Sequence, residues 1–271
     1  MARTSQTGSA HTAPAWAWAW LGLSFGLALA LVMYAPARWL GSILAHRTGG
    51  QVLLQGARGT VWNGSAQLVI TAGHGSRDAA ALPSRLEWTL QPAPGGLRLS
   101  LFAACCTARP LLLRLQARLE DGAVSPRIEV ADGAMSQWPA SLLVGLGTPW
   151  NTLQLEGQVQ VSTRGLVLAR GREGLQMAGQ AELVALGVSS RLTTLRPMGS
   201  YRIRIEGGPS PTLEVTTLEG GLQLAGTGRW VHSRLRFSGE ASTSPGREAV
   251  LSNLLNIIGR REGARSIISL G

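Results

Sequence analysis

The stretch LLLRLQARLE, residues 111–120, alternates apolar and polar side chains along its length. Leu113, Leu115, Ala117 and Leu119 fall on every second position, with arginine, glutamine and glutamate on the positions between them. Side chains of a β-strand point alternately to the two faces of a sheet. The stretch therefore predicts a strand with one buried face and one wet face, as in an antiparallel sheet that packs on one side only.

The same period of two recurs along most of the chain. Further examples cover residues 86–90, 97–101, 153–161, 201–206 and 234–237. Turn-forming glycine, proline, aspartate and serine cluster between them, at 92–96, 121–122, 207–211 and 220–221. We expect a mainly β fold: a curved antiparallel sheet whose halves, 50–147 and 148–271, form a duplicated meander. Asn63-Gly64 predicts a type I′ turn between strands at 60–62 and 66–70.

Two segments break the alternation and predict helices. Pro139 opens a short apolar segment that ends at Gly147, which predicts a short helix in the middle of the chain with proline in its first turn. Ser244-Pro245 offers a helix cap followed by proline, and an apolar stripe of helical period then runs to a stop at Gly259. This second helix is amphipathic, and a final strand is predicted over 266–270.

An uncharged apolar stretch, AWAWAWLGLSFGLALALVMYA, covers residues 15–35. Its length and its aromatic ends predict a single transmembrane anchor helix. The competing interpretation is a cleaved signal peptide with its cleavage site at 35–37, although the apolar run is long for that and Pro36 lies inside the site. We expect a short tail over 1–14, the anchor over 15–35 and a β-rich domain over 36–271. Arg3 and the free N-terminal amine on one side are nearly balanced by Arg38 and Arg47 on the other, so charge does not set the orientation.

The charge of the chain is unusual. Its 271 residues include 25 arginines, no lysine and 15 acidic residues, for a formal net charge of +10. The lack of lysine excludes P-loop and Schiff-base chemistry. The arginines are scattered through the strands, which argues against a nucleic-acid partner. They fit a solvated sheet face, a face directed at anionic lipid or an acidic partner, or the codon bias of a GC-rich genome.

The sequence offers no catalytic, cofactor-binding or metal-binding residues. His11, His46, His74 and His232 have none of the usual metal-ligand spacings, and there is no nucleophile elbow or recognisable triad. We therefore expect a protein that is not an enzyme and binds no cofactor. Adjacent Cys105 and Cys106 would point to opposite faces of a strand, which favours two small packed residues over a bond between them and leaves an intermolecular bridge open.

Several motifs, in this order, resemble the type II secretion system protein N family, also called general secretion pathway protein N. They are GTVWNG at 59–64, LEWTLQP at 86–92, LGTP at 146–149, GSY at 199–201, GLQLAGTGRW at 221–230, RFSGEA at 236–241 and LLNIIGRR at 254–261.

The resemblance implies a non-enzymatic, single-pass inner-membrane protein with a cytoplasmic N-terminus and a periplasmic C-terminal domain. It would assist the export of folded proteins from the periplasm across the outer membrane, with other type II secretion components and inner-membrane lipids as partners. The family has no assigned catalytic residues. The alternative is a membrane-anchored periplasmic lipid-binding or lipid-transfer protein with a β-groove similar to that of AsmA-type proteins.

Overall fold

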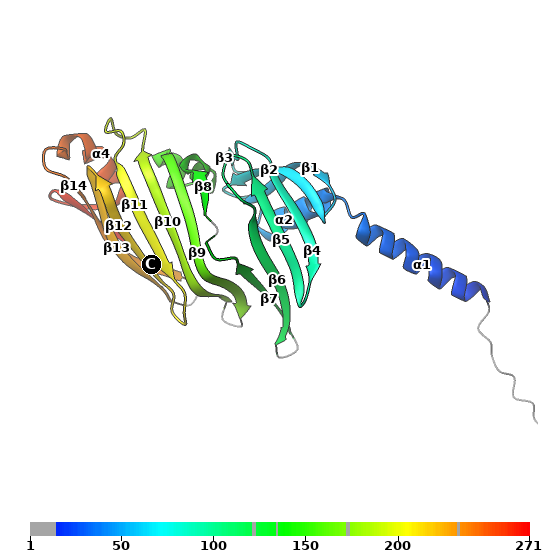
Figure 1. Cartoon of the computed structure of the whole chain (residues 1–271). Coiled ribbons are helices and arrows are strands. Elements are labelled where there is room, and N and C mark those ends of the chain that lie inside the picture. The colour runs from blue at the N-terminus through cyan, green and yellow to red at the C-terminus, as the bar shows by residue number, and fades with distance from the viewer. Residues whose placement is uncertain (1–14, 121–122, 134, 172–173, 232–233) are drawn as a thin grey trace, which may run out of the picture.

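A computed structural model describes residues 15–271 except 121–122, 134, 172–173 and 232–233 (Figure 1). The predicted tail over 1–14 lies outside these residues. The described helices are α1 (Ala15–Met33), α2 (Ala37–Arg47), the 3₁₀ helix η1 (Ala140–Leu146), α3 (Trp150–Leu153) and α4 (Glu248–Ile258).

Sixteen strands form one antiparallel sheet, which confirms the predicted mainly β fold. The strands of the N-terminal part are β1 (Val52–Gly59), β2 (Asn63–Thr71), β3 (Ala79–Ala81), β4 (Leu86–Ala93), β5 (Gly96–Ala103), β6 (Leu111–Glu120), β7 (Ala123–Val130) and β8 (Ser136–Pro139). Those of the C-terminal part are β9 (Glu156–Gly171), β10 (Gly174–Ser189), β11 (Gly199–Glu206), β12 (Thr212–Gly220), β13 (Leu222–Val231), β14 (Arg234–Thr243), β15 (Arg260–Glu262) and β16 (Arg265–Leu270).

The sheet is a long meander in which most strands lie beside the next strand of the chain. Its order is β1-β2-β4-β5-β6-β7-β9-β10-β11-β12-β13-β14-β16-β15, with β3 paired to β2 and β8 to β9. Figure 1 shows a curved, open sheet, so β1 and β15 are its two edges. Residues 127–129 of β7 pair with 167–169 of β9, so the sheet runs without a break across the proposed halves. The duplication of those halves stays a prediction.

One face of the sheet carries the apolar side chains. Register places Trp88, Leu101 and Leu111 side by side across β4, β5 and β6, and Leu183 beside Ile203 across β10 and β11. All the helices after α1 that enclose a core pack on this side, which we call the helix face. The opposite side, the open face, carries most of the polar side chains of the same strands, with a few apolar ones such as Phe102, Leu112 and Ile267 among them.

The core lies in three clusters under these helices. The cluster under α4 joins the fully buried Leu251, Leu254 and Leu255 to Tyr201 of β11 and Ala241 of β14. A second lies under η1, around Leu142 and Leu82. The third packs Ala37 of α2 against Trp88. The apolar stripe predicted for the C-terminal helix is therefore the part of α4 that packs against the helix face of the sheet.

The N-terminal helix α1 projects away from the sheet (Figure 1), and Trp16, Trp18, Trp20 and its leucines are exposed. It ends at Met33, two residues before the predicted end, because the backbone of Ala35 accepts a hydrogen bond from Val61 and Pro36 bridges to Thr60. Among the residues that the structure describes, no helix combines the length and apolar character needed to cross a membrane. The predicted transmembrane anchor over 15–35 is thus not confirmed.

Two local predictions need correction. The first hairpin turns at 60–62, and Asn63-Gly64 already belongs to β2, because residues 60 and 61 bond to the segment at 35–36. Helix α4 begins at Glu248, after Arg247 as N-cap, so Ser244-Pro245 lies in the preceding turn and does not cap it. The stop at Gly259 and the final strand are confirmed, and the short helix predicted after Pro139 is the 3₁₀ helix η1.

Candidate interaction surface

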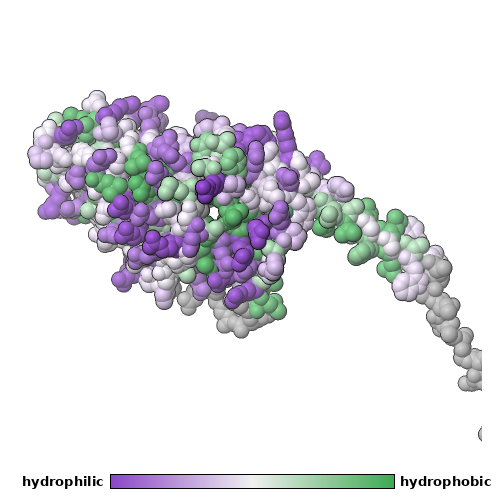
Figure 2. Space-filling model, viewed as in Figure 1, coloured by the Kyte–Doolittle hydropathy of each residue, from purple (hydrophilic) through white to green (hydrophobic). Residues whose placement is uncertain are grey.

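The open face is rich in charge, and most of it is positive. Register places more arginines than carboxylates there. The arginines include Arg58, Arg98, Arg114, Arg118, Arg127, Arg164, Arg202, Arg204, Arg229, Arg234, Arg236, Arg260 and Arg265, and the carboxylates include Glu87, Glu129, Glu182, Glu206, Glu214, Glu219, Glu240 and Glu262. Figure 2 shows hydrophilic residues over most of the sheet surface in view. The predicted wet face thus exists and carries an excess of arginine.

Part of this arginine is paired with carboxylate. Arg204 Nη2 donates to Glu182 Oε2 at 3.2 Å, and Arg202 Nε lies 3.7 Å from the same oxygen. Near the C-terminal edge, Arg265 Nη1 lies 3.3 Å from Glu240 Oε2. These side chains are about half exposed, so each pair contributes at most about 1 kcal/mol to stability. Glu182 therefore compensates about half of the positive charge that Arg202 and Arg204 bring to this face.

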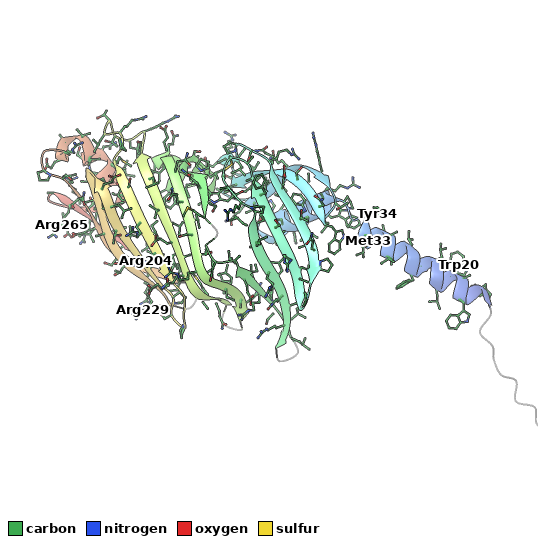
Figure 3. All side chains as sticks on the ribbon, viewed as in Figure 1. Trp20, Met33, Tyr34, Arg204, Arg229 and Arg265 are labelled. Atoms are coloured by element: carbon green, nitrogen blue, oxygen red, sulfur yellow. A yellow bond between two sulfur atoms is a disulfide. The ribbon has the colours of Figure 1, made fainter. Side chains whose placement is uncertain are left out.

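Other arginines face each other directly. Arg229 of β13 is the cross-strand partner of Arg236 of β14, and Arg98 of β5 is the partner of Arg114 of β6. Directly opposite side chains of an antiparallel pair have Cβ atoms about 5 Å apart, and like charges at that spacing destabilise the sheet. No carboxylate among the described residues lies within ion-pair distance of Arg229 or Arg236. Figure 3 labels Arg204 of β11 and Arg229 of β13, two strands that are separated by β12.

A shallow depression of about 760 Å³ surrounds the Arg229–Arg236 pair. Arg204, Glu206 and Glu214 line it, and the hydroxyl residues Thr227 and Ser238, which are cross-strand partners, lie on the same face one pair along the ladder. The depression therefore offers two unpaired guanidinium groups and two hydroxyls, bordered by carboxylates. Such a set can bind carboxylate or phosphate oxygens.

The helix face is not covered along its whole length. Leu119 and Val124 are cross-strand partners beyond the helices and are 76% and 68% exposed. Leu175 at the start of β10 and Leu270 at the end of β16 are also exposed. The apolar surface of the sheet thus continues past the part that α2, η1 and α4 cover.

Tyr201 is a buried tyrosine whose environment changes its pKa. It lies in the cluster under α4, and its hydroxyl donates to the carbonyl of Leu222 at 3.1 Å. Burial raises the pKa of this hydroxyl above its ordinary value of 10.0, because the charged form would lose its hydration. Only the neutral phenol can serve as this donor, so the residue has a structural role.

The two cysteines form a disulfide, which corrects the prediction of two separately packed residues. The prediction assumed a strand, but Cys105 and Cys106 lie in the turn after β5, where adjacent side chains need not point to opposite faces. Cys106 packs in the cluster with Leu142, and its carbonyl accepts a hydrogen bond from Gln137 of β8. The bridge therefore sits where β5 contacts β8 and η1.

The other candidates for chemistry do not gather. His46 lies on α2 and His74 in the loop after β2, while His11 and His232 fall outside the described residues. Within the described part of the chain, no three His, Cys, Asp or Glu side chains form a group that could hold a metal ion.

The family model for the type II secretion system (T2SS), protein N, matches residues 50–268. The chain belongs to the type II secretion system protein N family. No curated protein and no solved structure matches it. The match begins next to β1 and covers nearly the whole sheet of this protein N family member. It confirms the family that the motifs indicate.

The first two motifs of the protein N family have a structural role here. Trp62 Nε1 donates to the carbonyl of Val32 at 2.8 Å, and Trp88 Nε1 donates to the carbonyl of Val61 at 3.0 Å. Gly64 leaves room for the Trp88 ring, since a Cβ there would lie 2.6 Å from Trp88 Cζ2. Together they fasten the end of α1 and the first turn to the sheet.

The arginine pairs on the open face could not be predicted from the sequence. Each arginine alternates with apolar residues in the expected way, but which arginine faces which depends on strand register. The only available signal was the abundance of arginine on wet positions.

Proposed function

We propose that the chain is a non-enzymatic inner-membrane component of the type II secretion system that contacts other parts of the apparatus. It would assist the export of folded proteins from the periplasm across the outer membrane. The observation that carries this proposal is an open sheet of sixteen strands with unpaired edges and a positively charged open face. Edge strands and charged faces are surfaces on which proteins dock.

The family match supports the secretion role, and the N-terminal segment supports a location at the inner membrane. The side chains of α1 are apolar and exposed, with Trp16, Trp18 and Trp20 near one end and Tyr34 just after the other. Aromatic residues favour the interfaces of a membrane. The proposed orientation has residues 1–14 in the cytoplasm, 15–35 in the membrane and 36–271 in the periplasm.

A secretion assay tests the role. Deleting the gene should lower the amount of a type II substrate outside the cell and raise it in the periplasm, and the full-length chain should restore export. Normal export from the deletion strain would refute the role. Location has a separate test, in which single cysteines at Ser5 and Ser210 are probed with a membrane-impermeant thiol reagent in a variant without native cysteines. Labelling at 210 alone in intact spheroplasts is expected, and labelling at 5 alone would refute the orientation.

The exposed apolar part of the helix face favours a second candidate, a lipid-binding groove. Leu119, Val124 and Leu175 could shield acyl chains, since burying each leucine-sized side chain gains about 2 kcal/mol. Native mass spectrometry of the purified chain would show co-bound lipid, and Leu119→Asp with Val124→Asp should remove it. A lipid-free wild-type chain would refute this second candidate.

A further inference from the structure

The open face holds a feature that the fold does not require. Arg229 and Arg236 face each other across β13 and β14, both exposed, although opposite charges would favour pairing of these strands. By contrast, Arg204, which lines the same depression, and Arg265, farther along the sheet, each have a carboxylate partner within 3.3 Å. A like-charge pair that costs stability is a sign of selection for something other than folding.

We propose that the Arg229–Arg236 pair is a docking site for an acidic segment of a partner protein, whose carboxylates bridge the two guanidinium groups. The inference rests on the proposed function, since it names the surface by which the chain would contact the secretion apparatus. Each guanidinium can bind a carboxylate through two parallel hydrogen bonds, a geometry that lysine cannot offer. Thr227 and Ser238 place two further donors beside the pair.

The surroundings of the pair favour a protein segment over a lipid surface. Glu206 and Glu214 line the same depression, Glu214 on β12 beside the strand of Arg229 and Glu206 on β11, one strand farther away. Neighbouring strands lie about 5 Å apart, so positive and negative groups alternate over short distances. A peptide can match this mixture with residues of both signs, whereas an anionic membrane surface would be repelled at each glutamate.

A second arginine pair repeats the pattern in the N-terminal part of the sheet. Arg98 and Arg114 are cross-strand partners on the same face and line another depression, of about 500 Å³. There Arg114 has a distant carboxylate neighbour, Glu129, at 3.9 Å. Because that pair is partly compensated, the Arg229–Arg236 pair is the sharper place to test the inference.

The test compares two double variants of the full chain with the same change in charge. Arg229→Gln with Arg236→Gln removes the pair. Arg191→Gln with Arg196→Gln is the control, because both arginines are also exposed but share Glu156, each at 3.7 Å, at the end of the sheet where β9 begins. The binding probe is a fluorescently labelled ten-residue peptide with glutamates and serines at its centre and a lysine near each end, so that it carries residues of both signs but is acidic overall. It is titrated at several salt concentrations, and vesicles of phosphatidylglycerol serve as the lipid probe.

The expected result has three parts. The Arg229/Arg236 variant should bind the peptide at least about tenfold more weakly, from the loss of charge-assisted hydrogen bonds, while the control binds like wild type. Its melting temperature should be unchanged or higher, since a repulsion is removed. In cells in which deletion of the gene lowers export, the Arg229/Arg236 variant should lower it too, and the control should not.

Three results would overturn the inference. Equal peptide affinity of the two double variants would show that bulk charge suffices. Loss of vesicle binding in the Arg229/Arg236 variant with peptide binding intact would assign the site to lipid. Full export by this variant, in cells where deletion abolishes export, would reject the docking site while leaving the secretion role intact.

Discussion

We expect the stability of this protein to fall at alkaline pH, mainly because Tyr201 is buried. The chain has no lysine and two tyrosines, and both of its cysteines are in a disulfide. Among side chains, tyrosine is therefore the one type expected to titrate between pH 9 and 11. Tyr34 is 78% exposed, whereas Tyr201 is 6% exposed and donates to Leu222.

The sign and size of the effect follow from linkage. The folded-state pKa of Tyr201 is raised above the unfolded value of 10.0, so the folded form is favoured at its full strength below pH 10 and loses that advantage as pH rises. At pH 11 the unfolded tyrosine is about nine-tenths ionised while the folded one stays neutral. The free energy of unfolding should then be lower by about 1.4 kcal/mol at pH 11 than at pH 8, so the protein is less stable at the higher pH.

The assay is urea unfolding followed by tryptophan fluorescence at pH 8, 9, 10 and 11, with Tyr201→Phe as the matched variant. The variant should be about 1 kcal/mol less stable at pH 8, since the Leu222 carbonyl loses its donor, but its stability should hardly change up to pH 11. The two curves should therefore meet near pH 11. A wild-type curve that is flat over this range, or a variant curve with the same slope as wild type, would refute the reasoning.

Three further perturbations have clear expected outcomes. Leu255→Ala should lower the free energy of unfolding by about 2–5 kcal/mol in urea titrations, because the Leu255 side chain is fully buried. Ile257→Ala on the same helix should lower it by well under about 1 kcal/mol, because Ile257 is 44% exposed. Equal losses would contradict the packing of α4. Gly64→Ala should destabilise by about 1–3 kcal/mol in the same titrations, since its Cβ would meet the Trp88 ring and the carbonyl oxygens of Arg58 and Thr60, and a neutral result would contradict this packing. The Cys105–Cys106 bridge should protect both cysteines from alkylation by iodoacetamide until a reductant is added, and alkylation without reductant would show that no bridge forms. Because the bridge closes a very short loop, its removal should lower the free energy of unfolding by only about 1 kcal/mol.

Sequence periodicity was sufficient for the sheet and for the assignment of its faces. Alternation such as that over 111–120 depends only on which side of a strand is buried, and that property is local. The helix that covers Tyr201 was equally visible, because an apolar stripe of helical period up to Gly259 needs a surface to pack against.

The errors came from contacts between segments that are distant in sequence. Asn63-Gly64 has good turn chemistry, yet the turn forms earlier because Thr60 and Val61 bond to the backbone at 35–36. Those same contacts take Ala35 out of the N-terminal helix. The cysteine prediction failed for a related reason, since alternation continues almost to Cys105 and gives no sign that the strand ends at Ala103.

The residues that hold the fold together differ from those that we propose to bind a partner. The motifs by which the chain resembles its family include Trp62, Gly64 and Trp88, which fasten the first hairpin and therefore report on the fold. Arg229 and Arg236 also lie in family-like motifs, at 221–230 and 236–241, but their role in binding depends on their facing each other across two strands. Only the register of β13 on β14 brings the two together, and a fold gains nothing from that repulsion. A surface that binds a partner is therefore best sought where residues of the sheet reduce its stability, as the like-charged Arg229–Arg236 pair does.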